Sequence, residues 1–333
     1  MTMINGEQKF IATRDSYGNA LAELGDLYPN LVVLDADLAG ATKTSVFQKK
    51  FPDRHIDCGI AEANMTGIAA GLATCGMVPF ISSFAMFAAG RNYEQVRNSI
   101  GYPHLNVKIG ATHAGITVGE DGATHQCLED IALMRTIPGM TVIVPSDDIE
   151  ARAAVRAAIE HDGPVYMRFG RAPVAVFNDV DYTFEIGKAK VLKEGTDVTL
   201  IATGVMVQEA LEAAKLLGEK GVSAEVINMH TIKPLDAEAV ISSASKTGKV
   251  VTLEEHSIIG GLGSAVAEVL AEGIVSRGLA GLAGECQTRI SAPLLRIGIN
   301  DEFGQSGKAS ELMKHYGLNS EAICTKISTW LEK

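Results

Sequence analysis

Residues 141–168, TVIVPSDDIEARAAVRAAIEHDGPVYMR, contain a strand, a helix and a second strand in close succession. TVIVP at 141–145 and VYM at 165–167, which Arg168 follows, are short and largely apolar runs, and the segment 149–160 between them has helical length and spacing. Continuous apolar runs of this kind are typical of strands that are buried on both faces of a parallel sheet. The stretch therefore predicts a β-α-β unit, in which a helix crosses between two parallel strands.

The same alternation extends outward in both directions. Beyond an irregular stretch that begins at residue 173, it restarts and runs almost to the end of the chain. We therefore expect an α/β protein with two doubly wound domains, residues 1–175 and a smaller unit at 190–333, joined by a linker at 176–189. The other predicted strands are 31–34, 78–82, 107–111, 198–202, 222–228, 249–253 and 294–298, and the other helices are 16–27, 62–74, 91–100, 128–136, 207–218, 236–245, 263–274, 308–315 and 321–331.

The composition excludes several classes of function. The 333 residues carry 29 Lys and Arg against 40 Asp and Glu, a formal net charge of -11, so we expect no nucleic-acid partner. No apolar stretch is long enough for a membrane span, and residues 1–10 do not resemble a secretory signal, which together predict a soluble, cytoplasmic protein. No CxxC pair is present, so we expect reduced thiols and no metal ligands at the scattered cysteines, which are Cys58, Cys75, Cys127, Cys286 and Cys324.

The loop that follows the predicted strand at 107–111 concentrates titratable side chains. Residues 113–126, HAGITVGEDGATHQ, place His113, Asp121 and His125 among several glycines. In an open α/β sheet, ligands bind on the loops at the carboxyl ends of the strands, and histidine exchanges protons near neutral pH. The pattern favours a catalytic loop over the alternative, a surface turn with solvated polar residues.

Glu62 and two phenylalanines are further candidates, each with a purely structural alternative. Glu62 begins the predicted helix at 62–74 among small apolar residues. It is either a carboxylate stabilised by the helix dipole or a buried carboxyl kept for proton transfer. Phe84 and Phe87 follow the strand at 78–82, and they either pack in the core or form a stacking surface for a flat heterocycle. The residue pattern alone leaves both questions open.

A glycine-rich segment at 258–264, IIGGLGS, follows Glu254-Glu255-His256 and opens a predicted helix. It lacks the full spacing of a dinucleotide-binding fingerprint. We expect it to serve tight strand-to-helix packing rather than nucleotide binding.

Three separate segments agree in order and spacing with one enzyme family. Glu62, SFAMF at 83–87 and GEDGATHQ at 119–126 resemble the transketolase family of thiamine-diphosphate enzymes. The resemblance covers nearly the whole chain. Residues 1–175 resemble the pyrimidine-binding domain, with its parallel sheet, and residues 190–333 resemble the transketolase C-terminal domain, with a smaller, mixed sheet.

The resemblance implies roles for individual side chains. Glu62 would hydrogen-bond the aminopyrimidine ring of the cofactor through a desolvated, protonated carboxyl, and Phe84 and Phe87 would stack on that ring. In the loop, His125 resembles a histidine that handles sugar hydroxyl protons, and Asp121 resembles an aspartate that binds the hydroxyl beside the carbonyl. His113 would lie at the mouth of the substrate channel, and Asp37 would lie near the cofactor. Arg14 and Arg171 would bind the phosphate of the sugar. For each of these two arginines the alternative interpretation is a solvated surface charge.

Three positions depart from the family pattern. Ala61 stands where many transketolases have an arginine before the cofactor glutamate, and Ala41 stands where many have a phosphate-contacting serine. Gly90 stands where some have a third aromatic residue, one helical turn beyond the second. These departures leave the cofactor site intact and put the usual pentose-phosphate substrates in doubt.

The family also needs a diphosphate-binding domain, with a GDG motif followed by asparagine ligands for Mg²⁺, and this sequence contains no such unit. The resemblance therefore implies a two-chain enzyme in which this chain is the C-terminal subunit. We expect thiamine diphosphate to bind between the chains, Mg²⁺ to be held by an N-terminal subunit that carries the GDG-to-Asn domain, and the assembly to be an α2β2 heterotetramer.

The leading functional hypothesis is a subunit of a transketolase that transfers a two-carbon ketol unit from a ketose phosphate to an aldose or aldose phosphate. Two enzymes of related architecture are alternatives: a deoxyxylulose-phosphate-synthase-like enzyme, which Ala61 mildly favours, and the β subunit of a 2-oxo acid dehydrogenase, which the DGATHQ run disfavours. An alternative of another class is a non-catalytic assembly subunit. The joint presence of Glu62, Asp121 and His125 argues against it.

Overall fold

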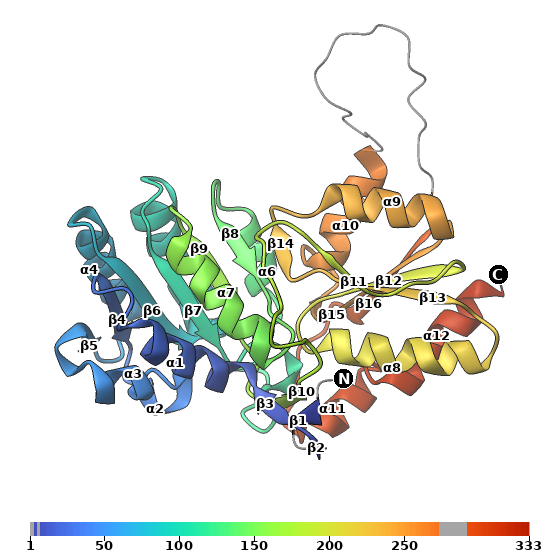
Figure 1. Ribbon diagram of the computed structural model, residues 1–333, viewed down its shortest axis with the longest axis horizontal. Helices are drawn as coiled ribbons and strands as arrows, with labels where there is room; N and C mark the ends of the chain where they lie inside the picture. Colours follow the sequence, from blue (N-terminus) through green and yellow to red (C-terminus); the bar gives the residue numbers. More distant parts are fainter. Residues whose placement is uncertain (1–2, 5–6, 273–291, 333) are drawn as a thin grey trace, which may run out of the picture.

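A seven-stranded sheet forms the first domain in the computed structural model, which describes residues 3–4, 7–272 and 292–332 (Figure 1). All neighbouring strands in it are parallel except β14, which pairs antiparallel with β8. The unit predicted from residues 141–168 is present as β8, α7 and β9. From edge to edge the strands are β14 (Thr231–Lys233), β8 (Thr141–Ile143), β9 (Val165–Arg168), β7 (Lys108–Thr112), β6 (Val78–Phe84), β4 (Leu31–Asp35) and β5 (His55–Asp57).

Helices cover both faces of this sheet, which confirms the doubly wound arrangement. Successive residues of β6, Phe80 and Ile81, belong to two different apolar clusters, because side chains alternate between the faces of a strand. Asp147 is the N-cap that precedes α7, and its side chain accepts a hydrogen bond from the backbone N–H of Glu150. The helices α1 (Thr13–Leu24) and α7 (Asp148–Glu160) bury the Phe80 cluster, and α4 (Glu62–Thr74) and α6 (Asp130–Arg135) bury the Ile81 cluster.

A smaller, five-stranded sheet forms the C-terminal domain. Four of its strands are parallel and β11 is antiparallel to β13, so the sheet is mixed, as expected. Helices α8 and α12 pack on one face, and α9 and α10 pack on the other (Figure 1). The elements are β11 (Lys190–Lys193), β13 (Ala224–Asn228), β12 (Val198–Ala202), β15 (Val250–Ser257) and β16 (Leu294–Ile299) in sheet order, with α8 (Met206–Glu219), α9 (Ala237–Thr247), α10 (Leu262–Glu272) and α12 (Ser320–Leu331).

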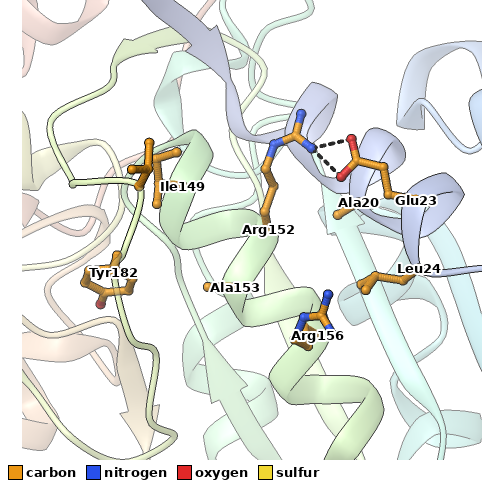
Figure 2. Close-up of a pocket in the computed structure, with 9 residues that line it drawn as sticks. Ala20, Glu23, Leu24, Ile149, Arg152, Ala153, Arg156 and Tyr182 are labelled. Atoms are coloured by element: carbon orange, nitrogen blue, oxygen red, sulfur yellow. Dashed lines mark hydrogen bonds and ion pairs between the residues drawn. The ribbon is translucent and has the colours of Figure 1, made fainter. Parts of the chain in front are cut away.

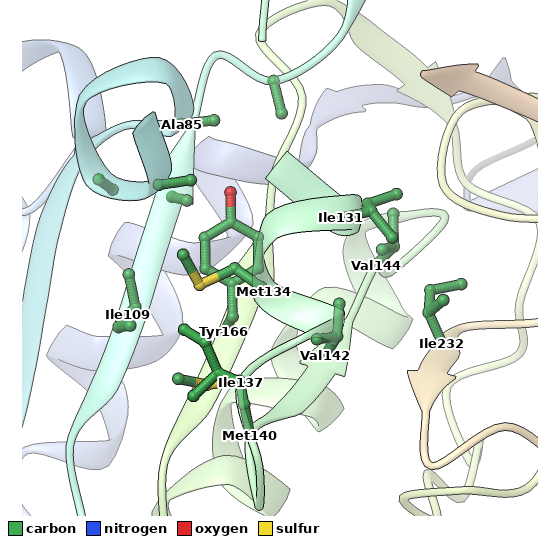
Figure 3. Packing of buried hydrophobic residues seen from close by; sticks show 14 of the residues in the cluster. Ala85, Ile109, Ile131, Met134, Ile137, Met140, Val142, Val144, Tyr166 and Ile232 are labelled. Atoms are coloured by element: carbon green, nitrogen blue, oxygen red, sulfur yellow. The ribbon is translucent and has the colours of Figure 1, made fainter. Parts of the chain in front are cut away.

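The two domains share one continuous apolar cluster. The β14 strand comes from the C-terminal half of the chain, yet it extends the first sheet, where Ile232 is buried in the same cluster as Val142, Val144 and Tyr166 (Figure 3). Full burial of one such aliphatic side chain stabilises a fold by about 1.5–3 kcal/mol. Packing across the cluster therefore fixes the position of one domain against the other.

Short elements complete the fold. β10 ends at residue 175 and β11 begins at residue 190, with no strand or helix between them. Outside residues 86–101, the short elements are β1 (Met3–Ile4), β2 (Glu7–Gln8), β3 (Phe10–Ala12) paired with β10 (Pro173–Ala175), α2 (Ala39–Thr42), α3 (Ser45–Lys50), η1 (Pro52–Arg54), η4 (Ile116–Val118) and α11 (Ala309–His315). Within the described ranges no helix has the length and apolarity needed to cross a membrane. The thiols of Cys58, Cys75, Cys127 and Cys324 are free, and Cys286 lies outside the described residues.

The glycine-rich segment serves strand-to-helix packing, as predicted. Glu254, near the end of β15, accepts hydrogen bonds from the backbone N–H groups of Leu262 and Gly263 at the start of α10, at 2.7 and 2.8 Å. A Cβ atom at Gly261 would lie 2.0 Å from a Glu254 carboxylate oxygen, so only glycine fits there. The chain's own carboxylate thus fills the helix N-terminus that a nucleotide phosphate would need.

Residues 86–101 differ from the expectation of a single α-helix at 91–100. Two π-helices, η2 (Met86–Arg91) and η3 (Val96–Gly101), flank α5 (Tyr93–Gln95). The N–H of Asn92 accordingly donates to the carbonyl of Phe87, five residues earlier, at 3.2 Å. Apolar spacing does not distinguish a π turn from an α turn, because the two differ by a single residue. π turns are rare and occur frequently at functional sites.

Candidate active site at the carboxyl ends of β6 and β7

The carboxyl ends of two neighbouring parallel strands bring predicted site residues together. Phe84, the last residue of β6, is paired in register with Thr112, the last residue of β7. His113 follows directly, and its ring lies 3.9 Å from the ring of Phe84, centroid to centroid. This edge of an open α/β sheet is where ligands bind.

Two more rings complete an aromatic cluster, which consists of Phe84, Phe87, His113 and His125. The ring of Phe87 lies 6.0 Å from that of Phe84 in a stacked orientation, with an interplanar angle of 21°. The ring of His125 lies edge-on to Phe87 at 5.4 Å. The cluster offers an apolar surface with an imidazole at its edge, and a flat heterocycle can stack on such a surface.

Glu62 is buried beside this cluster and is paired with an arginine. It is the first residue of α4, where the helix dipole favours a carboxylate, and it is 3% exposed. The Nη1 atom of Arg91 donates to both of its oxygens, at 3.1 and 3.2 Å. The same guanidinium lies 4.3 Å from the centre of the Phe87 ring, in a cation–π contact. Arg91 therefore connects Glu62 to the aromatic cluster.

Arg91 was missed by the sequence reasoning, although a signal was present. It lies four residues after Phe87, a spacing that brings side chains together on a helix. The π-helix η2 carries both residues.

Gly90, where some family members have a third aromatic residue, has little space for a side chain. A Cβ atom at Gly90 would lie 2.3 Å from the Cε atom of Met86, so a larger residue there would have to displace Met86.

His113 is buried and is held in one tautomer. A guanidinium only donates, so the 2.9 Å contact between Arg14 Nη1 and His113 Nε2 makes Nε2 the acceptor. Nδ1 then carries the proton and donates to Thr112 Oγ1 at 2.9 Å. Burial, followed by the charges of Arg14 and Arg171, lowers the pKa of His113 from 6.5 to about 3. The ring is therefore neutral near pH 7, and it orients Arg14 instead of acting as a free base.

The two predicted phosphate-binding arginines lie at the same end of the sheet. The backbone N–H of Arg14 donates to the carbonyl of Gly170, the residue before Arg171, at 3.4 Å. Arg171 donates from Nη1 to the carbonyl of Val118 at 2.7 Å and to the carboxylate of Asp121 at 3.3 Å. Arg171 and Asp121, expected to bind different parts of a sugar phosphate, are thus paired with each other in this chain.

His125 retains an unoccupied nitrogen. Its Nδ1 atom lies 2.9 Å from Thr124 Oγ1, and its Nε2 atom has no hydrogen-bond partner among the residues that the structure describes. The side chain is half-buried. A histidine with a free nitrogen at the edge of a stacking surface is suited to exchange a proton with a bound ligand.

Asp37 follows β4 and contacts Asp57. It has a φ of 60°, and its N–H donates to a carboxylate oxygen of Asp57 at 3.1 Å. Within the described chain its side chain makes no hydrogen bond or ion pair with Glu62 or the aromatic cluster, so its cofactor role stays a prediction. The neighbouring Asp35, which the sequence reasoning missed, accepts from the hydroxyls of Thr42 and Thr44, and burial raises its pKa to about 6.

The side chains fit the pyrimidine half of thiamine diphosphate. An aminopyrimidine needs a carboxyl partner and an apolar stacking surface, and Glu62 with Phe84 and Phe87 offers both. The Nε atom of Arg14 is buried without a hydrogen-bond partner, which leaves a donor for an anion nearby. For Mg²⁺, in contrast, the described part of the chain contains no group of three or more His, Cys, Asp or Glu side chains arranged to hold an ion.

A surface hollow between α1 and α7 has a lining that includes none of these site residues (Figure 2). One of its charged lining residues, Arg152, donates to both carboxylate oxygens of Glu23, at 2.7 and 2.9 Å, and also to Asp148. The Arg152 guanidinium is therefore already paired with two carboxylates, and a second guanidinium, that of Arg156, also lines the hollow.

Two family models match most of the chain. Residues 9–175 match the transketolase pyrimidine-binding domain, and residues 187–323 match the transketolase C-terminal domain. A Methanocaldococcus jannaschii protein named for the C-terminal section of transketolase is 52% identical over the full length of both chains. A 6-deoxy-6-sulfo-D-fructose transketolase subunit of Clostridium sp. (strain MSTE9) is 46% identical over 93% of this chain and 91% of its own.

A solved structure has the same fold over the same span. It is that of a split-gene transketolase, an inactive β4 tetramer, and it is 50% identical to this chain. It superimposes with a TM-score of 0.85 over 97% of this chain and 99% of its own. The shared architecture includes both α/β domains.

Proposed function

The chain belongs to the transketolase family, and we propose that it is the subunit of a two-chain transketolase that contributes the pyrimidine-binding side of the active site. As a transketolase subunit it is a transferase that acts with a partner subunit. The proposed reaction moves a two-carbon ketol unit from a ketose phosphate to an aldose or aldose phosphate. The observation that carries this proposal is the buried Glu62 carboxyl, joined through Arg91 to the aromatic cluster.

Glu62, Phe84 and Phe87 would hold the pyrimidine ring of thiamine diphosphate. When bound, that cofactor supplies the carbon nucleophile to which a ketol group is transferred. Glu62 would hydrogen-bond a ring nitrogen, which requires Arg91 to release at least one carboxylate oxygen. The Arg91 side chain is 53% exposed, so it has room to swing toward solvent. Its departure would free a Glu62 oxygen for the ring nitrogen of the cofactor.

The loop and the two arginines would hold the sugar phosphate. Arg14 and Arg171 suit a phosphate because guanidinium groups pair with two oxygens at once. A phosphate on Arg171 would compete with Asp121 for the same guanidinium and free that carboxylate to accept from a sugar hydroxyl. His125, at the edge of the cluster, would exchange a proton with a hydroxyl of the sugar. His113 would fix Arg14 at the entrance to the channel.

A partner chain would complete the site. We propose an N-terminal transketolase subunit that carries the GDG-to-Asn domain, binds the diphosphate and holds Mg²⁺ through oxygen ligands. The naming of two full-length relatives as a section or a subunit of transketolase supports this division. The proposed assembly is an α2β2 heterotetramer. Light scattering of the mixed subunits would give its mass, and a mixture that stays as separate species would remove the two-chain proposal.

Ketol transfer by the reconstituted pair is the direct test. The chain is mixed with an N-terminal subunit, thiamine diphosphate and Mg²⁺, and then supplied with ketose phosphates and aldose acceptors. We expect ketol transfer from the mixture and none from either chain alone. Reaction of pyruvate with an aldehyde phosphate would favour the deoxyxylulose-phosphate-synthase-like alternative, and oxidative decarboxylation of a 2-oxo acid would favour the dehydrogenase alternative. Inactivity toward all substrates, in a complex that binds the cofactor, would favour an assembly subunit.

Cofactor binding gives a second, independent test. The isolated chain offers contacts for the pyrimidine ring alone, so we expect it to bind thiamine diphosphate weakly in a calorimetric titration, and the complex to bind it far more tightly. Tight, Mg²⁺-dependent binding by the isolated chain would contradict the division of the site between two chains.

A further inference from the structure

Two adjacent buried glutamates on β15, Glu254 and Glu255, bind different parts of the molecule. Side chains alternate along a strand, so the two carboxylates point to opposite faces. Glu254 stays within its own domain and binds the first N–H groups of α10. Glu255 instead reaches the first domain, where its Oε2 atom accepts from the backbone N–H of Thr117 at 3.0 Å and from the Thr117 hydroxyl at 2.8 Å.

The loop 113–126 is shaped around the Glu255 carboxylate. Gly115 has a φ of 81°, and a Cβ atom at this position would lie 2.3 Å from the carboxyl carbon of Glu255. On its other side the carboxylate faces Arg168, whose Nη1 atom lies 3.7 Å from Oε1 and whose Nη2 atom donates to the Glu255 carbonyl at 3.2 Å. The carboxylate is therefore buried and is bound from both sides.

The C-terminal domain also contacts the far end of the loop. The buried amide of Gln126 donates to the carbonyl of Gln305 at 3.0 Å, and to the carbonyls of Ile116 and Gly119 within the loop, each at 3.2 Å. A Cβ atom at Gly122 would lie 2.5 Å from the hydroxyl of Ser306. Both ends of the loop that carries Asp121 and His125 are thus held by residues of the other domain.

A short path of contacts leads from Glu255 to the predicted substrate-binding residues. Glu255 fixes Thr117, and the next carbonyl along the chain, that of Val118, accepts from Arg171 at 2.7 Å. Arg171 in turn pairs with Asp121. Glu62, Phe87 and Arg91 lie on other elements and are not part of this path.

We propose that Glu255 is a positioning residue of the C-terminal domain that holds the loop 113–126 in the geometry needed to bind the sugar phosphate. The assignment of the loop to the sugar phosphate rests on the proposed function. Glu255 touches neither substrate nor cofactor. It acts through Thr117, so its loss would affect sugar binding and turnover while sparing the affinity for thiamine diphosphate.

Hydrogen–deuterium exchange of the full chain without its partner directly tests whether Glu255 stabilises the loop 113–126. In Glu255→Ala we expect amide exchange in 113–126 to rise about 10-fold or more, the scale for loss of a hydrogen bond to a charged acceptor. Glu255→Gln keeps an oxygen that can accept from Thr117, so amide exchange in 113–126 should rise less in this variant than in Glu255→Ala. Glu254→Ala is the matched control, because it should raise exchange at the start of α10 and leave 113–126 unchanged.

Thr117→Val keeps Glu255 and Arg168 and removes only the hydroxyl bond, so it tests the same contact if Glu255→Ala does not fold. Unchanged loop exchange in Thr117→Val and Glu255→Gln would overturn the inference, as would equal acceleration of the loop in Glu254→Ala.

Kinetics of the reconstituted complex provide the functional readout. In Thr117→Val and Glu255→Gln we expect the KM for the ketose phosphate to rise about 5-fold or more, with an unchanged Kd for thiamine diphosphate. An unchanged KM combined with weaker cofactor binding would overturn the inference. If the wild-type complex transfers no ketol group, the proposed function fails, and the exchange measurement still decides whether Glu255 holds the loop.

Discussion

Arg91 donates hydrogen bonds to both carboxylate oxygens of Glu62, at 3.1 and 3.2 Å, and thereby occupies the group that is proposed to bind the cofactor ring. The pair is asymmetric, since the Glu62 side chain is 3% exposed and that of Arg91 is 53% exposed. The arginine can therefore leave at little cost in packing, whereas the carboxyl cannot. In the chain by itself, the pairing neutralises a carboxylate that would otherwise be buried without a partner.

Replacement of Glu62 tests the cofactor assignment. Glu62→Gln keeps the size of the side chain and removes its ability to hold or release a proton. We expect ketol transfer by the complex to fall by about 10²-fold or more, the scale of lost proton-transfer catalysis. Glu94→Gln, an exposed glutamate on the neighbouring α5, is the matched control and should retain wild-type turnover. Normal turnover in Glu62→Gln would remove the basis of the assignment.

Replacement of Arg91 tests the ion pair. Arg91→Met leaves the buried carboxylate without its charge partner, and we expect the free energy of unfolding of the isolated chain to fall by about 1–2 kcal/mol, less than for a fully buried pair because the arginine is half exposed. The double variant Glu62→Gln, Arg91→Met should lose less than the sum of the two single changes. Denaturant unfolding measures all three values. Arg97→Met, which changes an exposed arginine of the next turn, is the control, and strict additivity would argue against the pair.

Replacement of His125 separates catalysis from cofactor binding. His125→Asn removes the free imidazole nitrogen, so we expect kcat to fall by about 10²-fold. The affinity of the complex for thiamine diphosphate should stay close to that of the wild type, because Glu62 and the two phenylalanines are untouched. Steady-state kinetics and calorimetric titration supply the two values. His315→Asn, on the exposed side of α11, should change neither. A loss of cofactor affinity equal to the loss of turnover would contradict the assigned role.

His113 predicts a specific pH dependence of stability. Its pKa is lowered to about 3 in the folded chain, by burial first and then by Arg14 and Arg171, and it returns to about 6.5 on unfolding. Between these values the unfolded chain binds a proton that the folded chain does not. The contribution of His113 to stability is therefore complete above pH 6.5 and is lost as the pH falls toward 3.

The variant His113→Gln isolates this contribution. Between pH 7 and pH 5 its free energy of unfolding should fall by about 2 kcal/mol less than that of the wild type, since each pKa unit corresponds to about 1.4 kcal/mol. Urea titrations of the isolated chain at the two pH values measure the difference. The pKa of His256 is also lowered by burial. Because His256 is present in both proteins, its contribution cancels from the difference between them. An identical pH dependence of the two proteins would show that folding does not lower the pKa of His113, contrary to this prediction.

Much of the fold could be predicted from the sequence because its signals are local. The alternation of apolar runs and helical spacing identified the α/β class, both sheets and most helices within a few residues. The resemblance indicated Glu62, Phe84, Phe87 and His125, and the structure brings these four side chains into one cluster with Arg91. It does not bring Asp37 into contact with them, because Asp37 lies in the turn after β4 and binds Asp57.

The local sequence pattern could not predict features that depend on the number of residues in a helical turn or on residues far away in the sequence. The segment 91–100 has helical spacing, yet the chain forms two π-helices over residues 86–101. The first of them, η2, carries both Phe87 and Arg91. The tautomer of His113 likewise depends on Arg14, a residue 99 positions away.

Composition and spacing already determined the order of strands and helices along the chain. They also determined which titratable side chains the loop 113–126 carries. Both features depend only on residues that are neighbours in the sequence. Folding alone decided the partners of the key side chains. Glu255 accepts a hydrogen bond from Thr117, 138 positions away in the sequence, and β14, from the C-terminal half of the chain, pairs with β8 of the first sheet. Such contacts follow from how buried apolar faces pack and how buried charges find hydrogen-bond partners in three dimensions, and no periodicity along the chain encodes them.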